Sequence, residues 1–256
     1  MKEKSVARVI SQTEIAPNIF DMWLETGIAK NAHPGQFVGV YPHNKSTILP
    51  RPISICEVNE EKTALRLVYR VAGQGTTEFS AYHAGDTVEV LGVLGNGFPL
   101  EAGKGKRVFL MGGGIGVPPI LQLAKELEAE KSVLVGYRDK NLFLKDDLGK
   151  YANVYVATED GSVGTKGNVM DAIKANELEA DVIFACGPMP MLRAIKKYAE
   201  EKNIPAYISL EEHMACGVGA CLGCVVKTKE VDHHSHVHNA RICTDGPVFE
   251  AKEVEI

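Results

Sequence analysis

The stretch VFLMGGGIGVPPILQLAKELEAE, residues 108–130, decides the fold. Its apolar start, residues 108–111, predicts a buried strand. The glycine-rich turn GGGIGVPP then leads into a helix, and Pro118 and Pro119 suit the first turn of that helix. In open α/β sheets a nucleotide binds where such a strand gives way to a helix. The turn is not G-x-G-x-x-G, so a tight turn without a ligand is the alternative interpretation.

The same alternation continues toward the C-terminus. Predicted strands cover residues 132–137, 153–158, 181–186 and 205–210, and predicted helices cover 168–178 and 190–203. This pattern predicts a doubly wound, parallel α/β domain over residues 102–210. A second strand-to-helix turn, CGPMPM, follows at residues 186–191. Two such turns at one sheet edge favour a dinucleotide site, and its candidate contacts are Gly113, Gly114, Gly116 and Gly187. Cys186 taken alone would be a buried core thiol.

Residues 1–101 have a different pattern. Short segments rich in Val, Ile and aromatic residues alternate with Gly, Pro and Asn turns, and they cover residues 5–15, 19–27, 36–42, 64–71 and 86–93. Such a series predicts an antiparallel β-barrel or a sandwich. The segment EAGKGK, residues 101–106, is predicted to be a linker between the two domains.

Three short motifs in the first domain suit a phosphate-bearing ligand. RPISI at residues 51–55 contains an arginine, whose backbone is restricted by the following proline, and the hydroxyl of Ser54. Arginine suits phosphate because its guanidinium forms a bidentate fork. VYR at 68–70 adds an aromatic residue and a second arginine, and GQGT at 73–76 adds a predicted glycine-rich turn that ends in a hydroxyl. Taken singly, each motif is better explained as a surface arginine or an ordinary hairpin.

The tail, residues 211–256, carries the most specific pattern. Cys216, Cys221 and Cys224 form C-x4-C-x2-C, and Cys243 follows after 18 further residues. The triplet matches the plant-type spacing that holds a [2Fe–2S] cluster through four thiolates. Interleaved glycines let backbone amides reach the sulfurs. A structural zinc site normally has two C-x2-C arms, and only one is present, so zinc is the weaker alternative.

Four histidines, His233, His234, His236 and His238, lie between the third and fourth cysteines. We interpret them as a solvated loop rather than a second metal site, because alternation along a flexible loop does not fix a coordination geometry.

Composition narrows the class of protein. The chain has 256 residues, of which 45% are hydrophobic and 24% charged, and these proportions are ordinary for a globular protein. The net charge of −5 gives no basic field for nucleic acid or an anionic membrane. The longest uncharged stretch, residues 108–124, contains four glycines and two prolines and is no spanning helix. With no apolar leader at the N-terminus, we expect a cytoplasmic protein.

The motifs RPIS, YRVAGQGT, LGNGFP, GGGIGVPP, CGPMPM and CGVGACLGC occur here in one order. Together they resemble the ferredoxin–NADP reductase superfamily with an appended [2Fe–2S] domain. More closely, they resemble the electron-transfer subunits of NAD-dependent (type B) dihydroorotate dehydrogenases, over about residues 5 to 252. The resemblance implies an FAD barrel, an NAD domain and a cluster domain, in that order.

The resemblance also implies roles for individual residues. Arg51 would contact the FAD pyrophosphate, Ser54 would lie near the flavin ring, and Cys186 would border the nicotinamide. The implied FAD contacts are Arg51, Pro52, Ile53, Ser54, Val68, Tyr69, Arg70, Gly75 and Thr76. The implied cluster ligands are Cys216, Cys221, Cys224 and Cys243.

The implied function is electron transfer in pyrimidine (UMP) biosynthesis. NAD accepts a hydride, a [2Fe–2S] cluster passes single electrons, and flavin does both, so FAD belongs between them. The expected order is FMN of a catalytic partner subunit, cluster, FAD, then NAD. The expected assembly contains two of each chain. The interface with that partner would include the small or apolar residues around the cluster, and the alternative is that they pack against the barrel: Gly217, Val218, Gly219, Ala220, Leu222 and Gly223.

Two other functions stay open on the sequence. One is a flavin and cluster subunit serving a ferredoxin:NADP transhydrogenase, a sulfite reductase or a soluble hydrogenase. The other is a zinc-stapled nucleotide-binding module without redox activity. The choice of nucleotide is balanced at residues 136–139, where Arg138 would hold a 2′-phosphate and Asp139 would repel one. The resemblance favours NAD.

Overall fold

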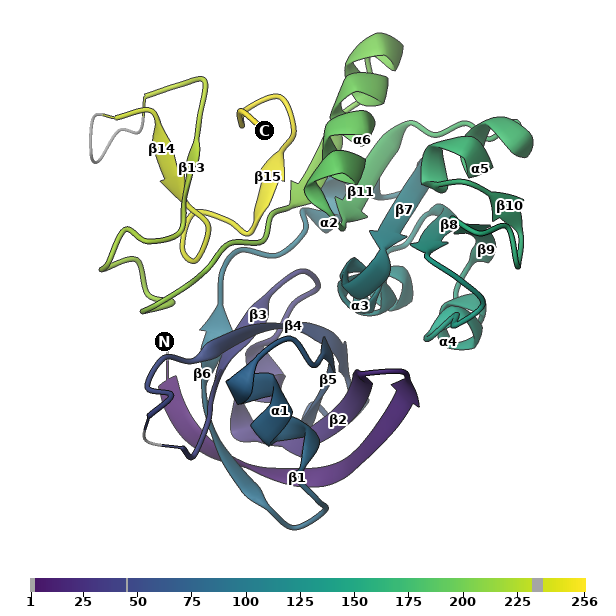
Figure 1. Cartoon of the computed structure of the whole chain (residues 1–256). Coiled ribbons are helices and arrows are strands. Elements are labelled where there is room, and N and C mark those ends of the chain that lie inside the picture. Colours follow the sequence, from purple (N-terminus) through teal and green to yellow (C-terminus); the bar gives the residue numbers. More distant parts are fainter. Residues whose placement is uncertain (1–2, 45, 232–236) are drawn as a thin grey trace.

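The computed structural model describes residues 3–44, 46–231 and 237–256. Its first part is a closed antiparallel barrel with strand order β1-β2-β5-β4-β3-β6 (Figure 1). The strands are β1 (Glu3–Ala16), β2 (Ile19–Glu25), β3 (Phe37–Tyr41), β4 (Arg51–Val58), β5 (Ala64–Arg70) and β6 (Thr87–Leu94). Alternate side chains of the strands fill the barrel interior, among them Val38, Val40, Leu65, Leu67, Val88 and Val90. The predicted barrel is confirmed.

Two local predictions in the barrel were wrong. RPISI begins β4, which is absent from the predicted strands, and GQGT is not a turn but lies at the start of helix α1 (Gln74–Ser80). The Thr76 hydroxyl accepts the amides of Ala72 and Gly73 at 2.9 and 3.1 Å and so caps this helix. Phe79 on α1 is fully buried against Tyr69, which ties the helix to the barrel.

The second part is a sheet with strand order β10-β9-β8-β7-β11-β12-β15, parallel except for β15. Its strands are β7 (Arg107–Gly113), β8 (Glu130–Tyr137), β9 (Asn153–Thr158), β10 (Thr165–Lys166), β11 (Val182–Cys186), β12 (Ala206–Ser209) and β15 (Val248–Glu250). Its helices are α2 (Leu100–Gly103), α3 (Pro118–Glu126), α4 (Lys145–Gly149), α5 (Val169–Ala175) and α6 (Met189–Lys202).

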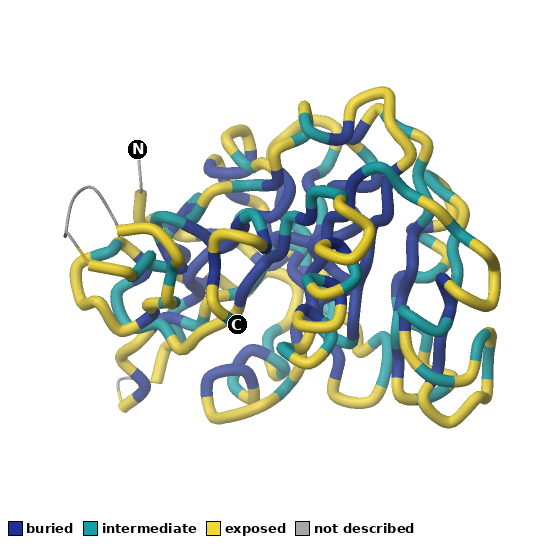
Figure 2. Tube along the Cα trace, turned by 90° about the horizontal axis from the view of Figure 1, so that it is seen from above, coloured by how far each residue is buried: buried dark blue, intermediate teal, exposed yellow. Residues whose placement is uncertain are grey.

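Helices cover both faces of this sheet. Residues of α3 and α4 share one core with it, and residues of α5 and α6 share another. Buried residues concentrate in the central strands, and exposed ones lie on loops and outer helix faces (Figure 2). The predicted doubly wound α/β architecture is therefore confirmed, although the first three residues of the expected linker, 101–103, belong to the short helix α2.

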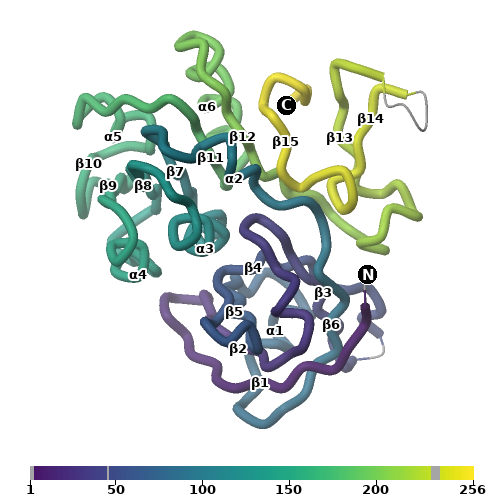
Figure 3. The backbone as a smooth tube through the Cα atoms, turned by 180° about the vertical axis from the view of Figure 1, so that it is seen from behind, coloured from purple at the N-terminus to yellow at the C-terminus, as the bar shows by residue number. Residues whose placement is uncertain are grey.

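The tail shares its core with the sheet. Cys224, Ile242 and Val254 pack in the same cluster as Leu192 of α6, and β15 pairs antiparallel with β12. The short strands β13 (Val225–Lys227) and β14 (Asn239–Arg241) form a separate pair. From behind, the tail lies beside the sheet edge and near the end of β6 (Figure 3). His233, His234 and His236 lie outside the described residues.

A cluster of charges joins the barrel to the α/β domain. Arg66 on β5 bonds Asp21 and Glu57 of the barrel at 2.7 and 3.1 Å, and it also bonds Asp147 of α4 at 3.0 Å. Lys125 of α3 contacts Glu57 at 3.1 Å. The Arg66 side chain is mostly buried, so these pairs fix how the two domains meet.

We expect Asp147→Asn to lower the free energy of unfolding by about 1 kcal/mol at neutral pH. Partial burial raises the pKa of Asp147, but its bonds to Lys150 and Arg66 outweigh this and hold that pKa below its usual 3.8. A carboxyl whose pKa is lower in the folded state stabilises the protein above 3.8, and this contribution is lost as the pH falls through the folded value.

Urea unfolding at several pH values tests this prediction. The wild type and Asp147→Asn should differ at pH 7 and converge in acid. Asp146→Asn is the control, because the Asp146 side chain is 99% exposed and forms a loose ion pair with its neighbour Lys145 at 3.8 Å. An equal loss of stability in both variants would contradict the assignment.

In the described part of the chain, no helix is both long enough and apolar enough to cross a membrane.

Candidate functional site

A cavity of about 560 Å³ lies between the barrel and the segment that follows β12. Most of the predicted FAD contacts line it: Pro52, Ile53, Ser54, Val68, Tyr69 and Arg70. They lie together because β4 and β5 are neighbours in the barrel. The barrel side of the cavity includes the apolar side chains of Phe37, Ile53 and Val68, and the cavity shares wall residues with a second one, so a flavin and its ribityl chain could extend from one into the other.

The second cavity, of about 480 Å³, contains Arg51 and shares Pro52, Glu212, His213 and Met214 with the first. Arg51 donates to the Leu49 carbonyl and lies over the first turn of α1, where an added Cβ on Gly75 would be 2.5 Å from its Nε. Among the described residues, the buried Thr47 hydroxyl in this cavity wall has no hydrogen-bond partner. An arginine and an unpaired hydroxyl suit a polar, anionic ligand. Gly75 and Thr76 themselves support Arg51 and α1 rather than line either cavity.

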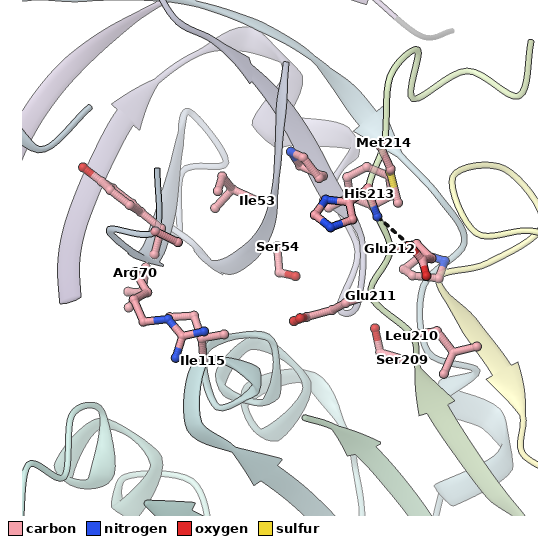
Figure 4. Close-up of a pocket in the computed structure, with 16 residues that line it drawn as sticks. Ile53, Ser54, Arg70, Ile115, Ser209, Leu210, Glu211, Glu212, His213 and Met214 are labelled. Atoms are coloured by element: carbon pink, nitrogen blue, oxygen red, sulfur yellow. Dashed lines mark hydrogen bonds between the residues drawn. The ribbon is translucent and has the colours of Figure 1, made fainter. Parts of the chain in front are cut away.

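Residues 209–214 form a wall that sequence analysis missed. Figure 4 shows the Glu211 carboxylate pointing into the first cavity from one side and Arg70 approaching from the other. Glu211 keeps contact with solvent, but its partial removal from water raises the pKa of its carboxyl, and the positive charge of Arg70 opposes this. Sequence analysis assigned no role in ligand binding to these residues. One signal was that they follow the carboxyl end of a parallel strand, where ligands bind in open sheets.

A third cavity, of about 410 Å³, lies at the carboxyl ends of β7 and β11. The strands run side by side with Cys186 opposite Gly112, and the order of the sheet reverses between them. All four glycines predicted for the nucleotide, Gly113, Gly114, Gly116 and Gly187, line this cavity. A Cβ on Gly116 would collide with the Cys186 carbonyl, so the two turns approach as closely as glycine permits.

Cys186 lies beneath this cavity rather than in its wall. Its side chain is 1% exposed, and burial raises the pKa of its thiol well above the usual value. The neighbouring Gly187 reaches the cavity instead. The role of Cys186 beside a nicotinamide stays a prediction.

The first and third cavities share three wall residues, Arg70, Ile115 and Glu211. Ligands in the two cavities would therefore meet at this point. At the opposite end, the third cavity is lined by Gly136, Tyr137, Arg138 and Glu159. Asp139 is not in its wall, because its carboxylate accepts the backbone and side-chain N–H groups of Asn141 at 2.8 and 2.7 Å. Sequence analysis considered Asp139 and missed Glu159, which follows the next strand.

Among the four tail cysteines, Cys216 lies beside Cys221 and Cys224 lies beside Cys243, and the charge of Cys216 also acts on Cys243. The Cys216 sulfur accepts the amides of Val218, Ala220 and Cys221 at 3.3–3.4 Å. Partial burial raises the pKa of Cys216, but these amide bonds outweigh it and lower that pKa to about 6.

A low thiol pKa and amide donors to sulfur suit thiolates that ligate a cluster. Within the described ranges, no three His, Cys, Asp or Glu side chains are already gathered into a metal-binding arrangement. The fit of the cysteines to a cluster therefore rests on the two thiol pairs and on their amide donors. Gly217 and Gly219 allow this loop, with φ of +66° and +85°.

A barrel with an elongated cavity, a nucleotide cavity that meets it and a cysteine-rich tail define the class of flavin- and iron–sulfur-dependent reductases. Comparison with solved structures agrees. A structure described as an NADH-dependent reduced ferredoxin–NADP oxidoreductase, studied for electron bifurcation, matches 98% of this chain and 90% of its own at 29% identity, with a TM-score of 0.86. A ferredoxin–NADP⁺ reductase from Neisseria gonorrhoeae with bound FAD and NADP matches 77% of this chain and 91% of its own at 14% identity and a TM-score of 0.67, which supports the fold alone.

The family follows from sequence comparisons. Residues 211–255 match the model of the iron–sulfur cluster binding domain of dihydroorotate dehydrogenase B. The dihydroorotate dehydrogenase B (NAD⁺) electron transfer subunit of Geobacillus sp. (strain WCH70) is 41% identical over 99% of both chains. The subunit of the same name from Listeria monocytogenes is 43% identical over 97% of this chain and 98% of its own. The chain belongs to the family of dihydroorotate dehydrogenase B electron-transfer subunits.

Proposed function

We propose that this protein transfers electrons between a dihydroorotate-oxidising catalytic subunit and NAD, as the electron-transfer subunit of a dihydroorotate dehydrogenase B. The observation that carries the proposal is identity of 41–43% across the whole chain, including the cysteine tail. The oxidoreductase studied for bifurcation is similar over as much of the chain but only 29% identical, so a transhydrogenase is the weaker candidate.

We infer which part of the chain binds each cofactor. FAD occupies the first two cavities, with Arg51 on its pyrophosphate and Ser54 near its ring. NAD occupies the third cavity, and Cys216, Cys221, Cys224 and Cys243 hold the cluster. We divide the chain into domains at 101/102 and 210/211, with β15 returning to the sheet. When bound, flavin exchanges a hydride with NAD and single electrons with an iron–sulfur cluster.

The protein's own residues would position the flavin and nicotinamide rings and shield them from water. Ile53, Val68 and Ile115 provide apolar walls, which exclude water from the meeting point of the two cavities. Arg70 and Glu211 add one positive and one negative charge at the same point. This arrangement favours a nicotinamide ring placed against the flavin ring.

We propose that the catalytic partner carries FMN and that the complex contains two copies of each chain. The exposed side chains of Val218 and Leu222, at 40% and 62%, flank the cysteines and are suitable for a protein interface. We place the complex in the cytoplasm, because cluster ligation needs reduced thiols.

The spectrum and metal content of the purified protein test the cofactors. We expect flavin and iron–sulfur absorption and about two irons per chain, as the cluster type requires. A colourless protein with one zinc would support the nucleotide-binding module instead.

We expect Glu159→Gln to lower the preference for NADH over NADPH about tenfold, or roughly 1.4 kcal/mol in relative kcat/KM. The carboxylate repels a 2′-phosphate, whereas the amide oxygen still accepts from the ribose hydroxyl of NAD. Steady-state kinetics with an artificial acceptor measure the ratio. Asp139→Asn is the matched control, because Asp139 faces Asn141 rather than the cavity. A shift in the control and none in Glu159→Gln would reverse the assignment.

A further inference from the structure

The motif LGNGFP, residues 94–99, begins at the last residue of β6 and has no role in the function proposed above. It lies where the barrel, the tail and the sheet meet. Its first residue, Leu94, is buried under the first cysteine loop, and a Cβ on Gly217 would be 3.1 Å from the Leu94 Cδ1. The turn therefore begins in contact with the loop of Cys216.

Asn96 binds the second cysteine loop directly. Its backbone amide donates to the Gly246 carbonyl at 2.6 Å. Its side-chain Nδ2 donates to the carbonyls of Asp245 at 3.0 Å and Thr244 at 3.3 Å. One residue of the barrel thus bonds three successive carbonyls immediately after Cys243, almost 150 positions later in the chain.

Gly95 brings the same loop against the flavin cavity. Its φ is +73°, and an added Cβ would lie 2.5 Å from the Pro247 Cδ and 2.9 Å from the Phe37 Cε1. Both Phe37 and Pro247 line the first cavity. The place where the Cys243 loop meets the barrel is therefore part of the proposed flavin site.

Phe98 connects the turn to the sheet. Its amide donates to the Pro34 carbonyl at 2.8 Å, and its ring packs edge-on against Phe184 of β11 with centroids 5.8 Å apart. Two residues further along β11 is Cys186, where the nucleotide turn begins. The turn thus contacts the elements that carry all three proposed sites.

We propose that residues 94–98 form the positioning element that fixes the Cys243 loop against the flavin cavity, and that Asn96 is its principal positioning residue. This inference rests on the proposed function. The LGNGFP turn then determines where the cluster and the flavin lie relative to each other. Their relative placement sets how readily electrons pass between them. Asn96 touches neither group in this proposal and acts through the backbone of residues 244–246.

The test uses full-length protein loaded with FAD and cluster. Amide hydrogen exchange reports on residues 244–246, and iron analysis reports on cluster content. Stopped-flow mixing with NADH follows flavin and cluster absorbance separately. The variants are Asn96→Ala and Gly95→Ala. Gly105→Ala is the control for Gly95→Ala, because Gly105 has a similar φ of +68° but nothing within 4 Å of an added Cβ.

We expect Asn96→Ala to retain iron and to reduce flavin at the wild-type rate. Exchange at residues 244–246 should rise about tenfold, the change expected when hydrogen bonds worth roughly 1.4 kcal/mol are lost. The ratio of cluster reduction to flavin reduction should fall. Gly95→Ala should lower that ratio further, and Gly105→Ala should leave it unchanged.

Wild-type exchange and a wild-type ratio in Asn96→Ala would overturn the proposal, as would identical behaviour of Gly95→Ala and Gly105→Ala. If wild-type protein itself lacked a cluster or failed to reduce flavin with NADH, the proposed function would be at fault instead.

Discussion

We expect Cys224→Ser to abolish dihydroorotate-dependent NAD reduction by the assembled complex, while NADH should still reduce artificial dyes. The Cys224 side chain is 2% exposed and interacts with Cys243, so its loss removes one proposed ligand and disrupts its partner thiol. Among the described residues, no cysteine lines the cavities proposed for flavin and nucleotide, so direct transfer from NADH to dye should not depend on Cys224. The measurement is the ratio of the two activities, taken with iron content.

Cys56→Ala is the control for this experiment, because Cys56 is a buried cysteine of the barrel and not of the tail. It should keep iron and the coupled activity. Full coupling of dihydroorotate to NAD in iron-free Cys224→Ser would show that electrons bypass the tail.

The second large effect is on FAD binding. We expect Arg51→Ala to remove the proposed charge-assisted bidentate contact, worth roughly 1.5–3 kcal/mol, and so to lower FAD affinity about 10- to 150-fold. Arg51 lies in the second cavity wall and above α1, where glycine at position 75 leaves room for its guanidinium. Titration of FAD-free protein with FAD measures the dissociation constant.

Arg8→Ala is the matched control, because Arg8 pairs with Glu25 on the exposed side of β1. It should bind FAD as the wild type does. An unchanged dissociation constant in Arg51→Ala would falsify the pyrophosphate contact.

Strands and helices were predictable where the hydrophobic periodicity and the flanking turn residues agree. β9 spans Asn153–Thr158, the predicted bounds, because a short apolar run is flanked by polar turns. β4 was missed because Pro52 near its start and the absence of alternation obscure a strand. Helix α1 was missed because Gly73 and Gly75 mimic a turn, and only the fold shows that Thr76 caps it.

The same difference between local and long-range patterns decides which parts of the site were predictable. Glycine turns at strand ends and the spacing of the cysteines are local patterns, so sequence alone located them. Glu211 and Glu159 reach their cavities only through the order of strands in the sheet, a long-range property that no local motif records. The return of β15 to the sheet was equally hidden, because a three-residue strand is too short to show a period.

The most direct test of the central claim is reconstitution with the dihydroorotate-oxidising catalytic subunit, which we propose contains FMN. Alone, this chain should oxidise NADH with dyes but should not oxidise dihydroorotate. Mixed with that subunit, it should confer NAD reduction driven by dihydroorotate. NAD reduction with dihydroorotate by the isolated chain, or none by the mixture of two fully loaded subunits, would contradict the account.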